Sequence, residues 1–282
     1  MTAPTHPFRC IALDAVGTLI FAQPAVSIAY AEIGQRHGSR QSAEQIKKRF
    51  ADAMLRADEL SIARFGEPGR TSEVYEWDFW RQVVSDVLPD VSDPHACFAE
   101  LFEHFARPES WRCFDDVGQT LTELERRGYR VLIASNFDAR LNRVCDGLPE
   151  LREVRCRVIS SLVWYRKTHP GFYAAVAQAA GCEPSDVLMV GDDFVNDVES
   201  AQAAGLTAVH LRRDGAGHRL TPTPTAWASA RLMTCRTHDG VADHVADHVA
   251  DLRPAHADGV AVKHVIGVSE IASLTDLLEW LP

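Results

Sequence analysis

The sequence predicts an α/β fold: a doubly wound, parallel, Rossmann-like sheet with an inserted all-helical cap domain. After Trp111, short apolar runs typical of buried strands alternate with helical patterns. Between Pro24 and Pro108 the patterning is helical and contains no convincing strand. Strands that alternate with helices favour a parallel sheet with right-handed crossovers. We therefore expect the helical stretch to interrupt the sheet domain as an insertion.

The first element is a buried strand over residues 8–13. This segment, FRCIAL, is a short apolar run that ends at Asp14 and is followed by Gly17, a residue typical of turns. The sequence therefore predicts that Asp14 stands at the end of a strand, and that residues 1–22 belong to the core domain.

The cap is predicted over residues 23–108 and is expected to contain four helices. Their signals are, in chain order, Pro24 as a first helical residue, a capping box of Ser42 and Gln45, an apolar stripe from Val74 to Leu88, and a start at Asp93 and Pro94. Four aromatic residues are expected to form the core of the cap rather than a pocket, namely Trp77, Trp80, Phe102 and Phe105.

Residues 109–282 return to the core domain. Asp116 is expected to cap a helix, and three apolar runs predict strands. These runs are Val131–Ala134, Val187–Val190 and Ala208–Leu211. Residues 214–262 predict an irregular insertion. A last strand near Val265 and a helix capped by Ser273 with Asp276 complete the core.

The composition favours a cytoplasmic globular protein. Apolar residues make up 46% of the chain, which excludes disorder throughout, and the formal net charge of −10 argues against nucleic acid as a partner. The sequence shows neither a secretory signal nor a run of about 18 apolar residues, so we expect no membrane association. Seven scattered cysteines without a CxxC pair are expected to be reduced thiols.

Polar residues stand where the predicted strands end. In an open parallel sheet, ligands bind beyond the carboxyl ends of the strands, and Asp14, Ser135 and Asp192 occupy such ends. Lys167 lies in a loop from which it could reach them. A carboxylate nucleophile, hydroxyl donors and an ammonium suit a phosphoryl group. Because Asp197 adds further negative charge, we expect a bound Mg²⁺.

Four segments resemble the motifs of the haloacid dehalogenase-like (HAD) hydrolase superfamily. The segment IALDAVGTL resembles the first motif and VLIASN the second. Lys167 in RKTHPGF resembles the third motif, and VGDDFVNDVESAQAAG the fourth. A cap inserted between the first two motifs is similar to that of the helical-cap branch of this superfamily.

The resemblance implies a role for each matching residue. It implies that Asp14 is the catalytic nucleophile, assisted by Lys167, and that the substrate is a small phosphorylated molecule. The implied phosphate ligands are Ser135, Asn136, Thr18 and Lys167. The implied Mg²⁺ ligands are Asp14, Asp192, Asp197, the main-chain carbonyl of Val16, and Asp193 as a further candidate.

Val16 departs from the pattern of the superfamily. Phosphatases of this type usually carry a second aspartate at this position, which protonates the leaving oxygen and later activates water. General acid catalysis is worth about 10²–10⁴-fold, so alkyl phosphates should be poor substrates unless His169 or a cap residue substitutes. Three activities remain open: a phosphatase for good leaving groups, a 2-haloacid dehalogenase, and a non-catalytic protein that binds metal and a phosphorylated ligand.

Overall fold

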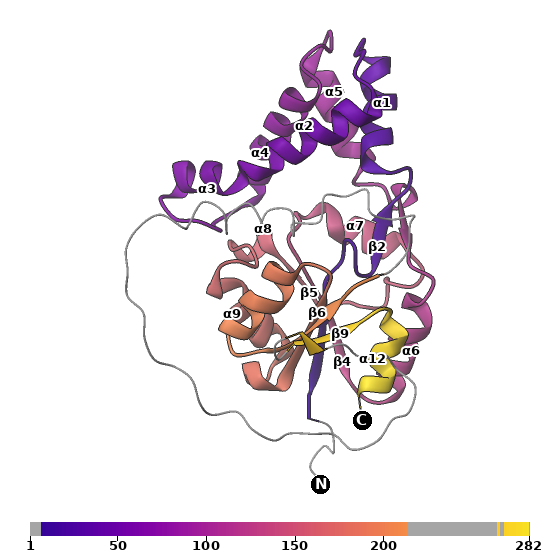
Figure 1. The fold of residues 1–282 in the computed structure, drawn as a ribbon, viewed down its shortest axis with the longest axis vertical. Coiled ribbons are helices and arrows are strands. Elements are labelled where there is room, and N and C mark those ends of the chain that lie inside the picture. The colour runs from indigo at the N-terminus through magenta and orange to yellow at the C-terminus, as the bar shows by residue number, and fades with distance from the viewer. Residues whose placement is uncertain (1–6, 214–263, 266–267, 282) are drawn as a thin grey trace.

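The structure is a computed structural model that describes residues 7–213, 264–265 and 268–281. The predicted insertion at 214–262 therefore lies outside the described residues. In Figure 1 a sheet flanked by helices forms the body of the molecule, and a group of helices stands above it. No helix in the described part of the chain is both long and apolar enough to cross a membrane.

The body is built on a seven-stranded sheet with the strand order β5-β4-β1-β6-β7-β9-β8. Every neighbouring pair is parallel except the last, in which β8 runs antiparallel to β9. The bounds are β1 Cys10–Leu13, β4 Arg130–Ser135, β5 Arg157–Ile159, β6 Val187–Gly191, β7 Thr207–Leu211, β8 His264–Val265 and β9 Val268–Ile271. This arrangement confirms the predicted parallel α/β sheet.

Helices cover both faces of this sheet. Along β1, Ile11 and Leu13 face one apolar cluster, whereas Cys10 and Ala12 face another. The first cluster includes residues of α6 (Val117–Arg126), α7 (Arg140–Gly147) and α12 (Leu274–Trp280); the second includes residues of α9 (Pro170–Ala180) and α10 (Ser200–Ala203). Because a strand between two helical layers is buried on both faces, its sequence is apolar throughout, as FRCIAL indicated.

Five helices fill residues 26–104, one more than predicted. They are α1 Val26–Arg36, α2 Ala43–Leu55, α3 Ala57–Phe65, α4 Glu73–Val87 and α5 Pro94–His104. The capping box at Ser42 and Gln45 and the start at Asp93 are present. The sequence missed α3 because α2 passes into it through Arg56 alone, without a side-chain cap to mark the start.

A short antiparallel ribbon joins the two parts of the molecule. Strand β2 (Ile20–Ala22) pairs with β3 (Trp111–Cys113), so that Ala22 lies opposite Trp111. The chain therefore enters and leaves the five helices at neighbouring points. We propose on this basis the division into a core of residues 1–22 and 109–282 and a cap of residues 23–108.

The strand predicted near Val265 is confirmed as the two-residue β8, which pairs with a further strand, β9, that extends the sheet beyond β7. One prediction about local structure is wrong. The Asp116 side chain makes no capping hydrogen bond to α6. It accepts hydrogen bonds from the Arg213 guanidinium at 2.9 and 3.0 Å and from the Leu274 amide at 2.8 Å instead. These partners are distant in sequence, so no local pattern indicates them.

Candidate active site

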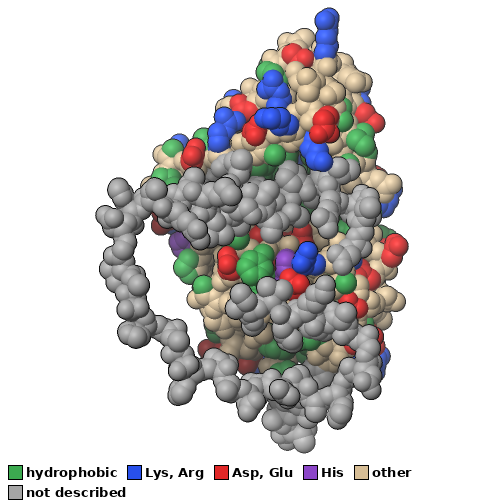
Figure 2. All heavy atoms as spheres, viewed as in Figure 1, with side chains coloured by type: hydrophobic (Ala, Val, Ile, Leu, Met, Phe, Trp, Pro, Cys, Tyr) green, Lys and Arg blue, Asp and Glu red, His purple; other side chains and the backbone are tan. Residues whose placement is uncertain are grey.

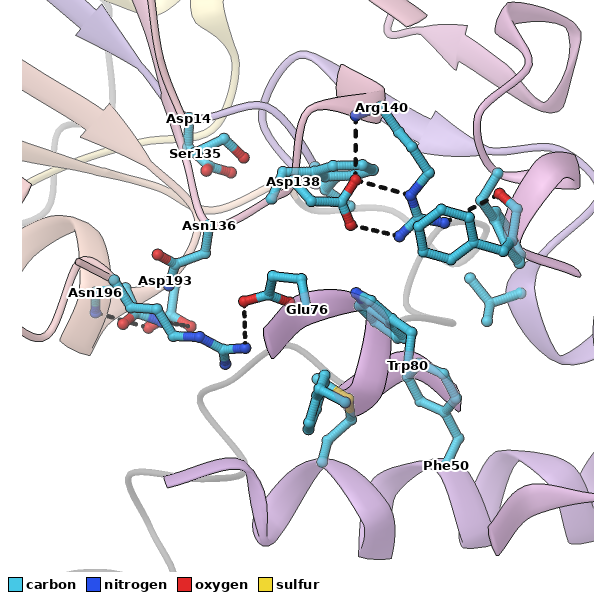
Figure 3. A pocket seen from close by; sticks show the side chains of 18 of the residues that line it. Asp14, Phe50, Glu76, Trp80, Ser135, Asn136, Asp138, Arg140, Asp193 and Asn196 are labelled. Carbon is cyan, nitrogen blue, oxygen red and sulfur yellow. Dashed lines mark hydrogen bonds and ion pairs between the residues drawn. The ribbon is translucent and has the colours of Figure 1, made fainter. Parts of the chain in front are cut away.

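Three neighbouring strands end at one cavity between the sheet and the cap. Asp14 follows β1, Ser135 ends β4 and Asp192 follows β6, and all three line a cavity of about 240 Å³. Figure 3 shows Asp14, Ser135 and Asn136 on the core side of this cavity, with Trp80 and Phe50 on the cap side. The structure thus brings together side chains that are far apart in the sequence, at the edge where ligands of such sheets bind.

A cluster of three carboxylates and one ammonium forms the floor of the cavity. Carboxylate oxygens of Asp14, Asp192 and Asp197 lie within 4.8 Å of one another. The Lys167 ammonium donates a hydrogen bond to Asp14 and another, at 2.6 Å, to Asp197. The Lys167 side chain is only 2% exposed. The ammonium therefore compensates part of a buried, concentrated negative charge.

Burial and mutual repulsion perturb these groups. Burial, reinforced by the charge of Asp197, raises the pKa of Asp14 to about 7, although Lys167 opposes this shift. Burial and the neighbouring carboxylates also raise the pKa of Asp192. Burial alone would lower the pKa of Lys167, but the two carboxylates that it contacts outweigh burial and raise it. The ammonium consequently stays charged.

The residues present fit a hard divalent cation. Three carboxylates face one ammonium, so the cluster carries excess negative charge when its acids are ionised. Carboxylate and carbonyl oxygens are the ligands that Mg²⁺ prefers, and a bound cation would reverse the raised pKa values. Asp14, Asp192 and Asp197 are the residues of this cluster that would hold it, and the carbonyl of Val16 as a further ligand stays a prediction.

Two glycines allow the carboxylates to approach. Gly17 has a φ of +93°, in the region that favours glycine, and a Cβ there would lie 2.3 Å from Oδ2 of Asp192. A Cβ on Gly191 would lie 2.1 Å from Oδ2 of Asp197. No side chain fits at either position without displacing a carboxylate.

Asp193 is occupied by local hydrogen bonds. It caps the π-helical segment η3 (Phe194–Glu199), where Oδ1 accepts from the amides of Val195 and Asn196 at 3.0 and 2.9 Å. Its Oδ2 accepts from the Asn196 side chain at 3.0 Å. Asp193 lines the cavity but is not part of the carboxylate cluster. Its hydrogen bonds fix the segment that carries Asp197.

The other candidate ligands occupy different places. Ser135 and Asn136 line the cavity, and the Asn136 side chain accepts a hydrogen bond from the Lys167 amide at 2.9 Å. Thr18 is fully buried outside the lining, and its hydroxyl donates to Asp192 at 3.3 Å. Val16, an apolar residue, also lines the cavity. The structure thus places Thr18 behind Asp192 rather than in contact with a ligand.

His169 does not line the cavity. Its Nδ1 accepts a hydrogen bond from the Gly171 amide at 3.0 Å, and its ring stacks on Tyr165 with centroids 4.2 Å apart. These contacts hold the start of α9. The suggestion that His169 replaces the missing acid therefore has no support in the geometry.

Cap aromatics line the cavity, against the expectation that they form only the core of the cap. Trp80, Phe102 and Phe105 are lining residues, whereas Trp77 packs behind them against Phe98 and Phe102. The apolar stripe of α4 is the signal that could have located Trp80. Which face of that helix turns to the core depends on the packing of the whole cap.

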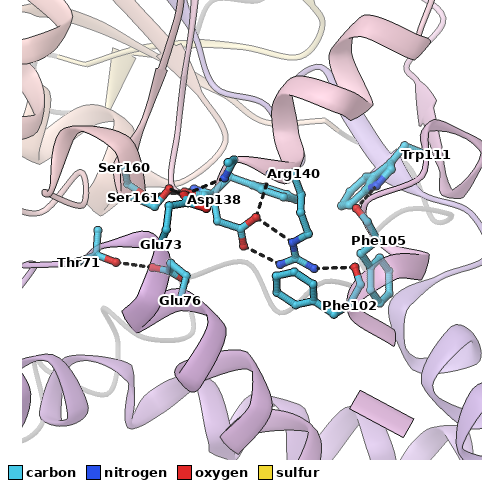
Figure 4. Close-up of polar contacts among 12 residues, drawn as sticks. Thr71, Glu73, Glu76, Phe102, Phe105, Trp111, Asp138, Arg140, Ser160 and Ser161 are labelled. Carbon is cyan, nitrogen blue, oxygen red and sulfur yellow. Dashed lines mark hydrogen bonds and ion pairs between the residues drawn. The ribbon is translucent and has the colours of Figure 1, made fainter. Parts of the chain in front are cut away.

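Two arginines of the core reach the cap but are each paired with an acid. Arg140 binds Asp138 through two hydrogen bonds, of 2.8 and 2.7 Å, and lies over the Phe102 ring at 3.6 Å (Figure 4). Arg166 donates to Glu76 of α4 at 2.7 Å, in contact with the aromatic lining. Both pairs lie at the cavity. The pair of Arg166 and Glu76 joins core and cap, and Arg140 reaches the cap by donating to the Phe102 carbonyl at 3.1 Å.

Comparison with known proteins gives the family of the chain. The model of the haloacid dehalogenase-like hydrolase family matches residues 8–205. The chain belongs to this family. This HAD hydrolase is 27% identical to haloacid dehalogenase-like hydrolase domain-containing protein 3 of Danio rerio, over 74% of this chain and 87% of that one. It is 25% identical to the phosphoserine phosphatase of Thermus thermophilus, over 73% and 89% of the two chains.

Solved structures share the fold of this HAD hydrolase. The L-2-haloacid dehalogenase of Xanthobacter autotrophicus has a TM-score of 0.62 at 17% identity and covers 96% of this chain and 97% of its own. A predicted phosphoglycolate phosphatase from Haemophilus somnus has a TM-score of 0.54 at 18% identity, with 82% and 99% covered. Because both kinds of protein have this fold, the fold alone does not distinguish a phosphatase from a dehalogenase.

Proposed function

We propose that this HAD hydrolase is a Mg²⁺-dependent phosphohydrolase that acts through a phosphorylated Asp14 on a small molecule. The observation that supports this proposal is the cluster of Asp14, Asp192 and Asp197 around Lys167, at the end of three parallel strands. A phosphoryl group carries up to two negative charges. The cluster can accept that charge only when a cation compensates its carboxylates.

Each residue of the cluster has its own role in the proposed reaction. A carboxylate oxygen of Asp14 attacks phosphorus, the bond to the leaving oxygen breaks, and the leaving group departs with the electron pair. Water then attacks the phosphorus of the aspartyl phosphate and gives up a proton to the solvent. The bond between phosphorus and the Asp14 oxygen breaks, which releases inorganic phosphate and restores the Asp14 carboxylate. Lys167 and the Ser135 hydroxyl would hold the phosphoryl oxygens. Bound Mg²⁺ would supply charge neutralisation at this site.

Val16 limits the substrates that this mechanism can use. Its apolar side chain lines the cavity where a proton donor would have to stand. Without general acid catalysis, an alkyl phosphate loses about 10²–10⁴-fold in rate. The carboxylate of an acyl phosphate, or the anion of a weakly basic alcohol in a phosphate ester, leaves as a stable anion, so its departure does not depend on this proton.

A 2-haloacid dehalogenase is the second candidate, because halide also leaves without a proton and Val16 suits it. Such a substrate carries a carboxylate, which would need a cation on the cap side of the cavity. Among the described lining residues, the cations on that side are Arg140 and Arg166, and each is paired with an acid. The acidic cluster and these pairs both favour the phosphohydrolase.

One experiment separates the candidates. Acetyl phosphate, p-nitrophenyl phosphate and 2-chloropropionate are incubated with the protein in Mg²⁺ or EDTA, and Asp14→Asn serves as the control. We expect phosphate release that requires Mg²⁺ and is lost in Asp14→Asn. Chloride release in EDTA would establish the dehalogenase instead. If none of the three substrates is hydrolysed while Mg²⁺ still binds, the result would favour a binding protein.

A further inference from the structure

The cap half of the cavity is built from aromatic side chains. Seven of the twelve lining residues between Val26 and Phe105 are aromatic, and Glu76 is the only charged one. Six of the aromatics are Phe50, Phe79, Trp80, Phe98, Phe102 and Phe105. The outer surface of the cap differs, because Lys and Arg side chains are interspersed there with Asp and Glu on the face turned to the viewer in Figure 2.

The charges at the edge of this aromatic half are already compensated. Glu76 accepts hydrogen bonds from Arg166 at 2.7 Å and from the Thr71 hydroxyl at 2.6 Å. The guanidinium of Arg140 uses three nitrogens on Asp138 and on the Phe102 carbonyl. A charged or hydroxyl-rich leaving group would lose its hydration on entering and find few partners in return. The aromatic half therefore selects against such groups.

The size of the cavity fits a small ring system. A cavity of about 150 Å³ lined by apolar side chains accepts benzene, and the cavity here measures about 240 Å³ including the part above the carboxylates. This volume has room for one ring together with a phosphoryl group. Aromatic rings in the lining add edge and face contacts to a bound ring.

We propose that the natural leaving group is an uncharged aromatic group, so that the substrate is an aryl or aroyl phosphate. This inference rests on the proposed function and names its substrate class. The phosphoryl group would lie at Asp14, Ser135 and Lys167, with the ring between Phe50, Trp80 and Phe102. When the bond from phosphorus to the leaving oxygen breaks, a phenolate or a benzoate-type carboxylate departs with the electron pair. Val16 then costs little in this step, because these anions are stable without immediate protonation.

The test compares two acyl phosphates that differ only in the ring. Acetyl phosphate and benzoyl phosphate share the same bond to be broken, and neither needs a proton donor. Their ratio of kcat/KM therefore reports the cavity rather than the chemistry. We expect benzoyl phosphate to be preferred by at least about 10-fold, because even one methylene in an apolar pocket is worth about 10–200-fold.

A pair of tryptophans on α4 supplies the matched variants. Trp80 lines the cavity and Trp77 does not, and each is changed to alanine. We expect Trp80→Ala to lose most of the preference for benzoyl phosphate and Trp77→Ala to keep it. Met54→Trp, which fills the cavity from α2, should slow benzoyl phosphate and spare acetyl phosphate. If Trp80→Ala fails to fold, Met54→Trp tests whether the ring of benzoyl phosphate occupies the cap half of the cavity.

The outcomes separate the substrate class from the proposed function. If both acyl phosphates are hydrolysed at equal kcat/KM, or if Trp80→Ala keeps the preference for benzoyl phosphate, the aromatic leaving group is refuted and the phosphohydrolase stands. If neither is hydrolysed, the proposed function fails. Calorimetry with phenylphosphonate and methylphosphonate in Mg²⁺ then tests the cavity alone. Tighter binding of phenylphosphonate would support an aromatic ligand for this cavity. Equal binding of the two phosphonates would overturn the proposal of an aromatic ligand.

Discussion

Lys167 and Asp14 form an ion pair that is almost completely withdrawn from solvent, and Asp197 binds the same ammonium from its other side at 2.6 Å. Asp14 directly follows β1, and Asp197 lies in η3. Lys167 therefore connects two segments that are far apart in the sequence. Removal of one member of a buried pair leaves an uncompensated charge. The stability of the apoprotein should therefore depend on Lys167.

Lys167→Met tests this dependence. We expect the free energy of unfolding in EDTA to fall by about 3–5 kcal/mol, the cost typical of breaking a buried pair from one side. Urea denaturation in EDTA and in Mg²⁺ measures it, and Mg²⁺ should restore part of the loss by compensating the carboxylates. Lys48→Met is the control, because Lys48 forms an exposed pair with Asp52. Equal effects of the two variants would contradict the assignment of a buried charge cluster.

The raised pKa of Asp14, about 7, predicts a dependence of Mg²⁺ binding on pH. Below this pKa the folded apoprotein holds a proton that the unfolded chain, with an ordinary carboxyl, has lost. The contribution of this carboxyl group to the stability of the folded state is thus largest below about pH 4 and is lost as the pH rises from about 4 to about 7. Mg²⁺ must displace the proton, so its affinity should rise with pH by up to about tenfold per unit below pH 7.

Thermal unfolding with Mg²⁺ or EDTA from pH 5.5 to pH 8 measures this effect. The difference in Tm between the two conditions cancels the titration of groups far from the site. We expect this difference to grow with pH and to level off above pH 7. In Asp14→Asn the pH dependence should weaken, and a difference independent of pH in the wild-type protein would refute the prediction.

Val16→Asp restores a carboxyl to the position from which superfamily phosphatases protonate the leaving oxygen. We expect turnover of alkyl phosphates such as glycerol 2-phosphate to increase by about 10²–10⁴-fold, the usual range for a general acid. The kcat/KM for acetyl phosphate, which reports the formation of the aspartyl phosphate, should gain little, because its leaving group needs no proton. The control is Val16→Asn, which has a similar shape but no transferable proton. An equal gain in both variants would show that polarity rather than proton transfer is responsible.

Much of this site could be anticipated from the sequence because its signals are local. Asp14 and Asp192 directly follow apolar runs, and the parallel sheet brings the ends of such runs to one edge. The roles of Trp80 and Asp116 were not accessible in this way. The face that Trp80 presents depends on how five helices pack, and the partners of Asp116 lie 97 and 158 residues away. Pattern and spacing carry no information on such contacts.

Gly17 offers a last test, because it combines an unusual backbone conformation with close contact to a candidate ligand. Gly128 has a similar positive φ, +84° against +93°, but a Cβ there would meet nothing within 4 Å. Gly128→Ala should therefore show backbone strain alone, of about 1–2 kcal/mol. Gly17→Ala adds a methyl group 2.3 Å from Oδ2 of Asp192, so the carboxylate must move.

We expect Gly17→Ala to lose Mg²⁺ affinity and phosphate release in addition to stability, whereas Gly128→Ala should lose stability only. Denaturation in EDTA gives the strain of each variant, and calorimetry with Mg²⁺ gives the affinity. Since Asp192 belongs to the carboxylate cluster, its displacement should weaken the metal site even in a fully folded protein. Unchanged Mg²⁺ affinity in folded Gly17→Ala would mean that Asp192 is not a ligand of the metal.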